Sequence, residues 1–155
     1  MHPLAHVLVG ALVGQVTNNP PVAILGGMAS HALLDALPHT EGRTYRNRPG
    51  PPTLPELLEA AVEIVAGVAL VAGVVRACPA ARDLSVAAGV LGALAPDLID
   101  QPLIVLYGAR VLHIPSLHWT VGRRHALWGI LTQVAVAVLA ALALWRATGC
   151  GAPGR

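Results

Sequence analysis

Long apolar runs alternate with short polar segments along the whole chain. None of the runs shows the strict polar/apolar alternation of barrel strands, and their length favours helices. The predicted helices are Pro3–Val16, Pro21–Leu37, Leu54–Ala77, a segment from Leu84 that crosses a polar break before Leu112, and Ala126–Ala147. We therefore expect an all-α bundle of about five short hydrophobic segments, kinked in the fourth by proline. It should form a single domain over residues 1–155.

Turn and glycine signals indicate how the first two helices pack. The sequence TNNPP at residues 17–21 is a strong turn signal and makes these helices a hairpin. Gly10 and Gly14 form a GxxxG pair, and Gly26, Gly27 and Ser30 follow on the second helix. Small residues at this spacing allow helices to approach closely in lipid.

Composition places the bundle in a membrane. Apolar residues make up 55% of the chain and charged residues only 12%, far from an ordinary soluble surface. The third and fifth runs reach the ~20 residues that span hydrocarbon. The chain contains ten arginines and eight acidic residues, and the arginines form no basic run. This pattern argues against a nucleic-acid partner. The N-terminal segment lacks a basic start, so we expect it to remain in the mature protein.

Counting helix directions brings the histidines to one side of the membrane. If consecutive segments alternate in direction, one end collects His2, His6, His31, His39, His113, His118 and His125. The same end, or the adjoining membrane half, collects Asp35, Glu56, Glu59, Glu63, Asp97 and Asp100. Imidazole and carboxylate are ligands of divalent metals, so the sequence predicts a metal site here.

Depth in the apolar runs separates ligands from solvated residues. We predict metal ligation by His6, His31, Asp35, Asp97 and Asp100, with His118 and His125 completing the shell, because unpaired polar groups there would be costly. His31, Asp35 and His39 follow an i, i+4, i+8 row unless Pro38 breaks the last turn, and Asp97 and Asp100 form an i, i+3 pair. Asp97, Asp100 and Glu63 are the catalytic candidates. Solvated positions are expected for His2, His113, Glu56 and Glu59.

This order of elements resembles the inner-membrane family of membrane-bound metal-dependent hydrolases. The likeness rests on His6, the PDLID element with Asp97 and Asp100, and HWTVGRRH with His118 and His125. It implies a small polytopic helical protein with metal-dependent hydrolysis. The segment SHALLDALPH is similar to the helix end of other small membrane proteins of no assigned activity, and adds His39 to the ligand candidates.

The leading hypothesis is an enzyme that hydrolyses a lipid-like ester or phosphoester at the membrane interface. The cofactor would be zinc, with manganese or magnesium as alternatives, and Arg123 and Arg124 would steady a head-group phosphate or simply mark a cytoplasmic loop. Membrane lipid is the expected partner. The sequence leaves open whether the chain forms a homo-oligomer. A metal or proton transporter and a structural interaction protein are the alternatives.

Arginine counts and cysteine positions predict which end of the bundle faces the cytoplasm. Six arginines flank the histidine side and four the opposite side, which favours a cytoplasmic histidine side in the inner membrane. Cys78 and Cys150 then lie at external helix ends, where they either form a disulfide or serve as small residues.

Overall fold

The computed structural model describes residues 2–39, 53–78, 80–107, 112 and 126–150, and the regular structure in these ranges is helical. The helices are α1 (Pro3–Thr17), α2 (Pro20–Asp35), α3 (Leu54–Ala77), α4 (Asp83–Tyr107) and α5 (Ala126–Ala147). Each begins within one residue of its predicted start. Proline occupies the first turn of α1, α2 and α3, where its missing amide costs least. The predicted all-α fold is confirmed.

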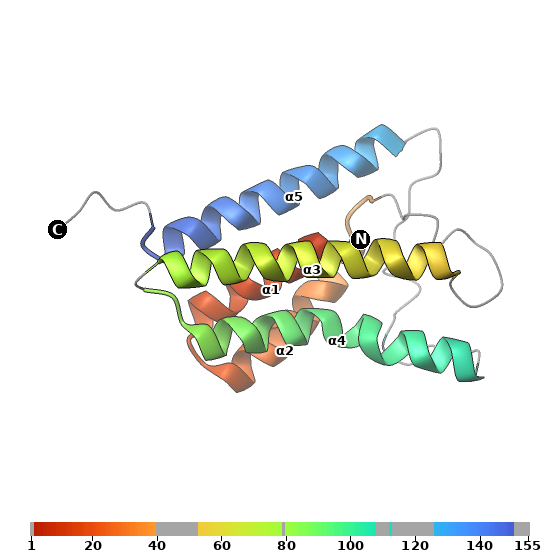
Figure 1. Cartoon of the computed structure of the whole chain (residues 1–155), viewed down its shortest axis with the longest axis horizontal. Helices are drawn as coiled ribbons and strands as arrows, with labels where there is room; N and C mark the ends of the chain where they lie inside the picture. Colours follow the sequence, from red (N-terminus) through yellow and green to blue (C-terminus); the bar gives the residue numbers. More distant parts are fainter. Residues whose placement is uncertain (1, 40–52, 79, 108–111, 113–125, 151–155) are drawn as a thin grey trace.

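Consecutive helices run in opposite directions along one long axis, so the bundle has two distinct ends (Figure 1). The histidine end contains the start of α1, α3 and α5 and the end of α2 and α4. The cysteine end contains the opposite termini. The tight α1–α2 turn lies at the cysteine end, where Asn18 adopts a left-handed φ of 49° and the Asn19 side chain caps α2 by accepting from the Val22 amide.

The first helix is the centre of the bundle, since α1 contacts each of the other four helices. The main apolar core surrounds it and comprises Val7, Leu8, Ala11, Val71, Val86, Val90, Leu94, Ala140 and Leu144. A 15-residue helix covers only about 22 Å, so α1 is short for a membrane span. Its neighbours instead shield it from the surroundings.

Glycines allow α1, α2 and α4 to touch backbone to backbone. A Cβ added to Gly10 would meet the Gly89 carbonyl oxygen of α4, and one added to Gly14 would meet the Ser85 carbonyl oxygen. Gly27 of α2 contacts Gly89 in the same way. The predicted close packing at these glycines is confirmed, and it fixes the separation of the helices that carry the histidine cluster described below.

Replacing Gly89 with alanine should therefore weaken the bundle by about 1–3 kcal/mol, because the new methyl group must push two backbones apart. The clash is with the Gly10 carbonyl and with the Gly14 nitrogen, 2.9 Å from the added Cβ. Gly73→Ala is the matched control, since nothing lies within 4 Å of its Cβ position. Thermal unfolding in detergent measures both variants. Equal melting temperatures would contradict this packing.

The cysteine end is held by a disulfide and by one buried amide. Cys78 and Cys150 are bonded to each other, which is one of the two roles that the sequence left open for them. The Gln15 side chain donates to the carbonyl oxygens of Ala80 and Ala147, at 2.8 and 3.2 Å, and accepts from the Arg82 amide. Gln15 thereby ties α1 to the α3–α4 turn and to the end of α5, a role that the apolar pattern does not reveal.

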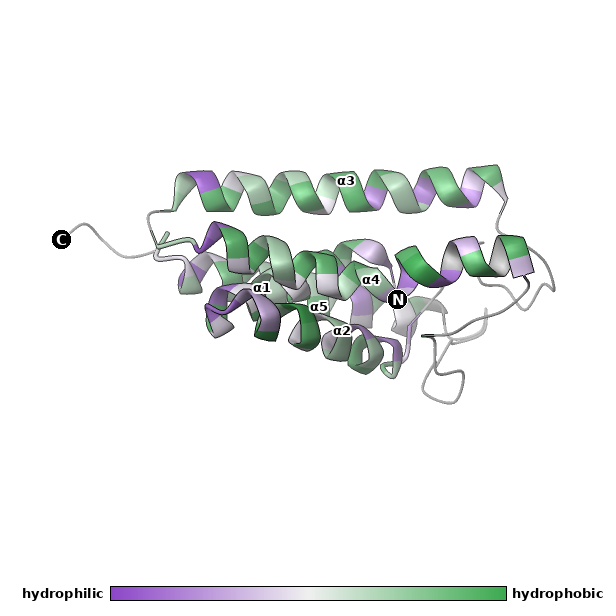
Figure 2. Ribbon diagram, turned by 90° about the horizontal axis from the view of Figure 1, so that it is seen from below, coloured by the Kyte–Doolittle hydropathy of each residue, from purple (hydrophilic) through white to green (hydrophobic). Residues whose placement is uncertain are grey.

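Two helices are long and apolar enough to cross a membrane, namely Leu54–Ala77 and Leu127–Ala147. Neither is a typical core helix, since only 11% and 22% of their most apolar windows are buried. Figure 2 shows α3 apolar along most of its length and set to one side of the other helices. In α4, Pro96 and Pro102 lie inside the helix, which bends in its second half as predicted (Figure 1).

Candidate metal centre

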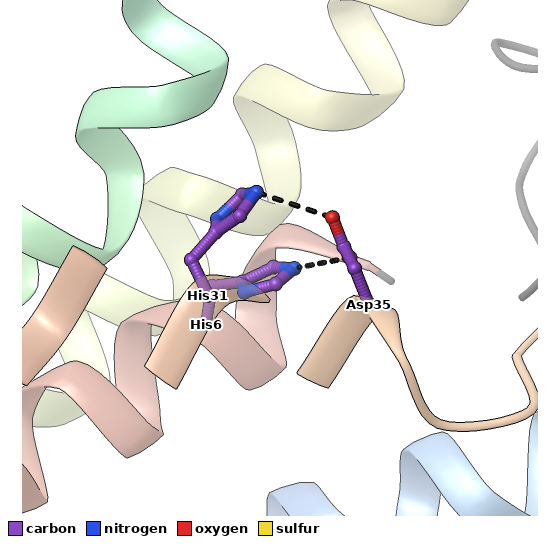
Figure 3. Close-up of side chains that lie close together, drawn as sticks. All are labelled: His6, His31 and Asp35. Atoms are coloured by element: carbon purple, nitrogen blue, oxygen red, sulfur yellow. Dashed lines mark ion pairs between the residues drawn. The ribbon is translucent and has the colours of Figure 1, made fainter. Parts of the chain in front are cut away.

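Two histidines and an aspartate meet between α1 and α2 in the half of the bundle nearer the histidine end. His31 and Asp35 are one turn apart on α2, and His6 comes from α1 (Figure 3). The His31 Nε2 atom lies 3.2 Å from Asp35 Oδ2, and the His6 Nε2 atom lies 3.4 Å from Asp35 Oδ1. The imidazole rings stack, with centroids 4.1 Å apart. Three predicted ligands thus converge.

The spacing of these atoms fits a small tetrahedral ion. Nitrogen and oxygen ligands about 2.0–2.1 Å from zinc stand roughly 3.4 Å apart at tetrahedral angles. The 3.2 and 3.4 Å separations are close to that value, and each imidazole faces a different carboxylate oxygen of Asp35. One ligand atom from each of the three residues lies within 4.8 Å of the others. The donors could therefore hold one divalent cation after small adjustments.

The orientation of His31 calls for a proton or a metal cation between its Nε2 atom and Asp35. Its Nδ1 atom lies 2.8 Å from the Ala93 carbonyl oxygen. Because a carbonyl only accepts, Nδ1 carries the hydrogen, and in the neutral ring the Nε2 lone pair points toward Asp35. A lone pair and a carboxylate repel each other unless a proton or a cation lies between them. Metal-binding histidines commonly donate their other N–H to a backbone carbonyl in this manner.

His6 is the second buried imidazole of the group. Its side chain is fully buried, and within the described ranges neither ring nitrogen has a hydrogen-bond partner. Figure 3 shows the ring turned toward Asp35. A buried polar group without a partner costs free energy, and a bound cation would remove that cost at Nε2.

Asp97 gives the cluster an accessible side. One of its carboxylate oxygens lies 3.9 Å from His31 Nε2. Its side chain is 21% exposed, against 0% for His6, 4% for His31 and 7% for Asp35. Asp97 is close enough to interact with an ion or its water, and it is the member of the group that solvent reaches.

Asp100, which the sequence paired with Asp97, contacts the backbone of the chain beyond α4. Asp100 is 1% exposed, and both of its carboxylate oxygens accept from the Leu112 amide, at 2.9 and 3.2 Å. This contact fastens the chain beyond α4 to the helix. It accounts for part of the burial of Asp100, and the metal-ligand role of this residue stays a prediction.

The predicted row of His31, Asp35 and His39 is wrong at its last member. Helix α2 ends at Asp35, and Pro38 follows outside the helix. His39 is fully buried, and its Nδ1 donates to the nearby Leu37 carbonyl at 2.7 Å. The remaining candidates, His118, His125, Arg123 and Arg124, as well as His113, lie outside the described residues.

A second group of potential ligands lies between the start of α1 and α3. His2 Nδ1 is 2.5 Å from Glu63 Oε1, and Glu59 completes a trio whose ligand atoms lie within 4.8 Å of one another. His2 is thus a partly buried partner of Glu63, where solvation was expected. Glu56 is buried rather than solvated, because its carboxylate accepts from the Thr53 amide and caps α3.

Comparisons of the chain with protein-family models, curated proteins and solved structures found no match. The resemblance to membrane-bound metal-dependent hydrolases therefore stays a prediction that rests on the residues quoted for it.

Proposed function

We propose that the protein is a membrane-embedded, metal-dependent hydrolase that acts on a lipid-like ester or phosphoester at the membrane interface. The observation that carries the proposal is the convergence of His6, His31 and Asp35 at metal-ligand spacing. Catalytic zinc sites typically use three protein ligands and keep a position for water, whereas structural zinc sites are closed by four. Among the described residues the set has three donors beside the partly exposed Asp97, which is the number typical of the catalytic type.

The exposed apolar surface supports membrane embedding. Residues of α3 and α5 that are at least 60% exposed include Leu54, Val62, Val65, Leu127, Trp128 and Leu139. Apolar patches of this extent on a monomer indicate a lipid or protein interface. Trp128 and Trp145, both exposed, lie seventeen residues apart on α5, about 26 Å along the axis. That separation approaches the ~30 Å hydrocarbon thickness, and interfacial tryptophans mark such boundaries.

In this proposal His6, His31 and Asp35 hold a divalent ion, with zinc the best fit to two nitrogens and one oxygen. The ion, when bound, would polarise the scissile bond and make water more acidic. Asp97 would accept a proton from attacking water, since its carboxylate is near the donors yet accessible. The Ala93 carbonyl fixes the His31 ring through Nδ1. Arg123 and Arg124 would contact a head-group phosphate.

Packing below the site favours an enzyme over a transporter. A transport path must continue through the other half of the bundle, but Val7, Leu8 and Ala11 follow His6 on α1 with exposures of 0 to 2%. Gly10 and Gly14 press against the α4 backbone at the same level. The polar Gln15 beyond them is bonded to backbone groups.

The decisive experiment combines elemental analysis of the purified protein with an assay on phospholipids and lipid phosphates, with and without chelator. We expect about one ion per chain at the site formed by His6, His31 and Asp35. We also expect product release that chelator prevents. If no substrate is turned over, and liposomes that contain the protein show metal flux that depends on Asp35, the protein is a transporter and not a hydrolase.

We further propose that the histidine end faces the cytoplasm. Both native cysteines are joined at the other end, in keeping with an oxidising exterior. Asn47→Cys would therefore supply the only free thiol of the chain. It should resist membrane-impermeant maleimide in intact cells and react after permeabilisation. Ala80→Cys, at the exposed turn of the cysteine end, is the reciprocal control. Labelling of position 47 from outside would reverse the orientation.

A further inference from the structure

We propose that His2, Glu59 and Glu63 form a second divalent-cation site, separate from the His6, His31 and Asp35 centre. The two groups share no residue. Glu59 and Glu63 are one turn apart on α3, and His2 precedes the first turn of α1. The site therefore bridges the central helix and the peripheral helix α3.

Unbalanced charge supports a cation here. Within the described ranges, the ion pair of this group joins His2 Nδ1 and Glu63 Oε1 at 2.5 Å. The other oxygen of Glu63, Oε2, is buried and, among the described residues, has no hydrogen-bond partner. Two carboxylates held together near one imidazole repel each other. A divalent cation would remove the repulsion and supply the partner that Oε2 lacks.

The donor set predicts which cation binds. One nitrogen and two carboxylates form a harder set than the two imidazoles and one carboxylate of the first site. The second site is also more open, because His2 and Glu63 are 28% and 23% exposed. We expect it to take a hard ion such as Mn²⁺ with water ligands, while zinc occupies the first site. This inference does not depend on hydrolysis.

The test is Mn²⁺ titration, followed by electron paramagnetic resonance, of the purified full chain carrying one equivalent of zinc. Wild type should bind one further Mn²⁺. The double variant Glu59→Gln and Glu63→Gln should bind Mn²⁺ at least about 100-fold more weakly, since even outer partners of ligands are worth ~10–100-fold. It should retain its zinc, which also reports that it is folded. Asp83→Asn, an exposed acid at the cysteine end, is the control.

Two results would overturn the second site. One is Mn²⁺ affinity in the double variant equal to that of wild type. The other is loss of both ions in Asp35→Ala, which would mean one shared site. If the double variant does not fold, His2→Gln provides the same comparison, because it removes a single donor ahead of the helix and should weaken Mn²⁺ binding while zinc remains.

Discussion

Replacing Asp35 with alanine should abolish metal binding at the first site and lower the free energy of unfolding by about 3–5 kcal/mol, the typical cost of removing one member of a buried pair. Asp35 contacts both imidazoles, at 3.2 and 3.4 Å. Without it, His6 and His31 would lie stacked in the bundle without their shared carboxylate. The bound ion also contributes its binding free energy to folding, and that contribution would disappear as well.

The measurement is thermal unfolding in detergent, with and without chelator. In protein loaded with one equivalent of zinc alone, chelator should lower the melting temperature of wild type and change that of Asp35→Ala much less, because the variant no longer holds zinc at the first site. Asp83→Ala provides the control, since this acid is exposed at the start of α4 and its removal should change stability by no more than about 0.5 kcal/mol. A metal-loaded Asp35 variant with a wild-type response to chelator would remove Asp35 from the site.

Helix positions could be predicted because local signals agree with the tertiary structure. Proline marks the starts of α1 to α3, and TNNPP separates α1 from α2. The predicted end of α2 at Leu37 was two residues late, since helix formation stops before Pro38. Alternating helix directions also placed Cys78 and Cys150 at the same end, and their disulfide confirms that count.

Which helices lie at the centre of the bundle and which at its periphery could not be predicted, because lipid-facing and protein-facing helix surfaces are both apolar. The long α3 is less buried than α5, with 11% against 22% of its most apolar window buried, whereas the short α1 is enclosed. Glycines carried the available information, since Gly10 and Gly14 allow α4 to approach α1. Hydropathy alone gives no such distinction.

Within the candidate site, the sequence predicted residue types better than their grouping. His31 and Asp35 share a helix face and could be paired from their spacing. The contribution of His6 required only that α1 and α2 form a hairpin. The partnership of His2 with Glu59 and Glu63 depends on how α3 leans against α1, where Gly67 meets Val7, and no local pattern encodes that contact.

Asp97→Asn should retain the metal and lower kcat by about 10²–10⁴-fold, the usual contribution of a general base. Asparagine keeps the shape of the side chain but cannot accept the proton. Asp97 lies 3.9 Å from His31 Nε2, farther than Asp35, and is 21% exposed. These two facts make it better suited to act on water than to bind the ion tightly, although the sequence alone did not separate the two roles.

The assay compares metal content, kcat and KM of Asp97→Asn with those of Asp83→Asn, the same substitution on the same helix at the cysteine end. Loss of an interaction made only in the transition state lowers kcat while KM stays near its wild-type value. Loss of metal together with activity would instead make Asp97 a fourth ligand, and the closed site that results would be a structural one. Full activity with full metal content would exclude Asp97 from the chemistry. Only the combination of retained metal and lost turnover supports hydrolysis at the first site with Asp97 as the general base.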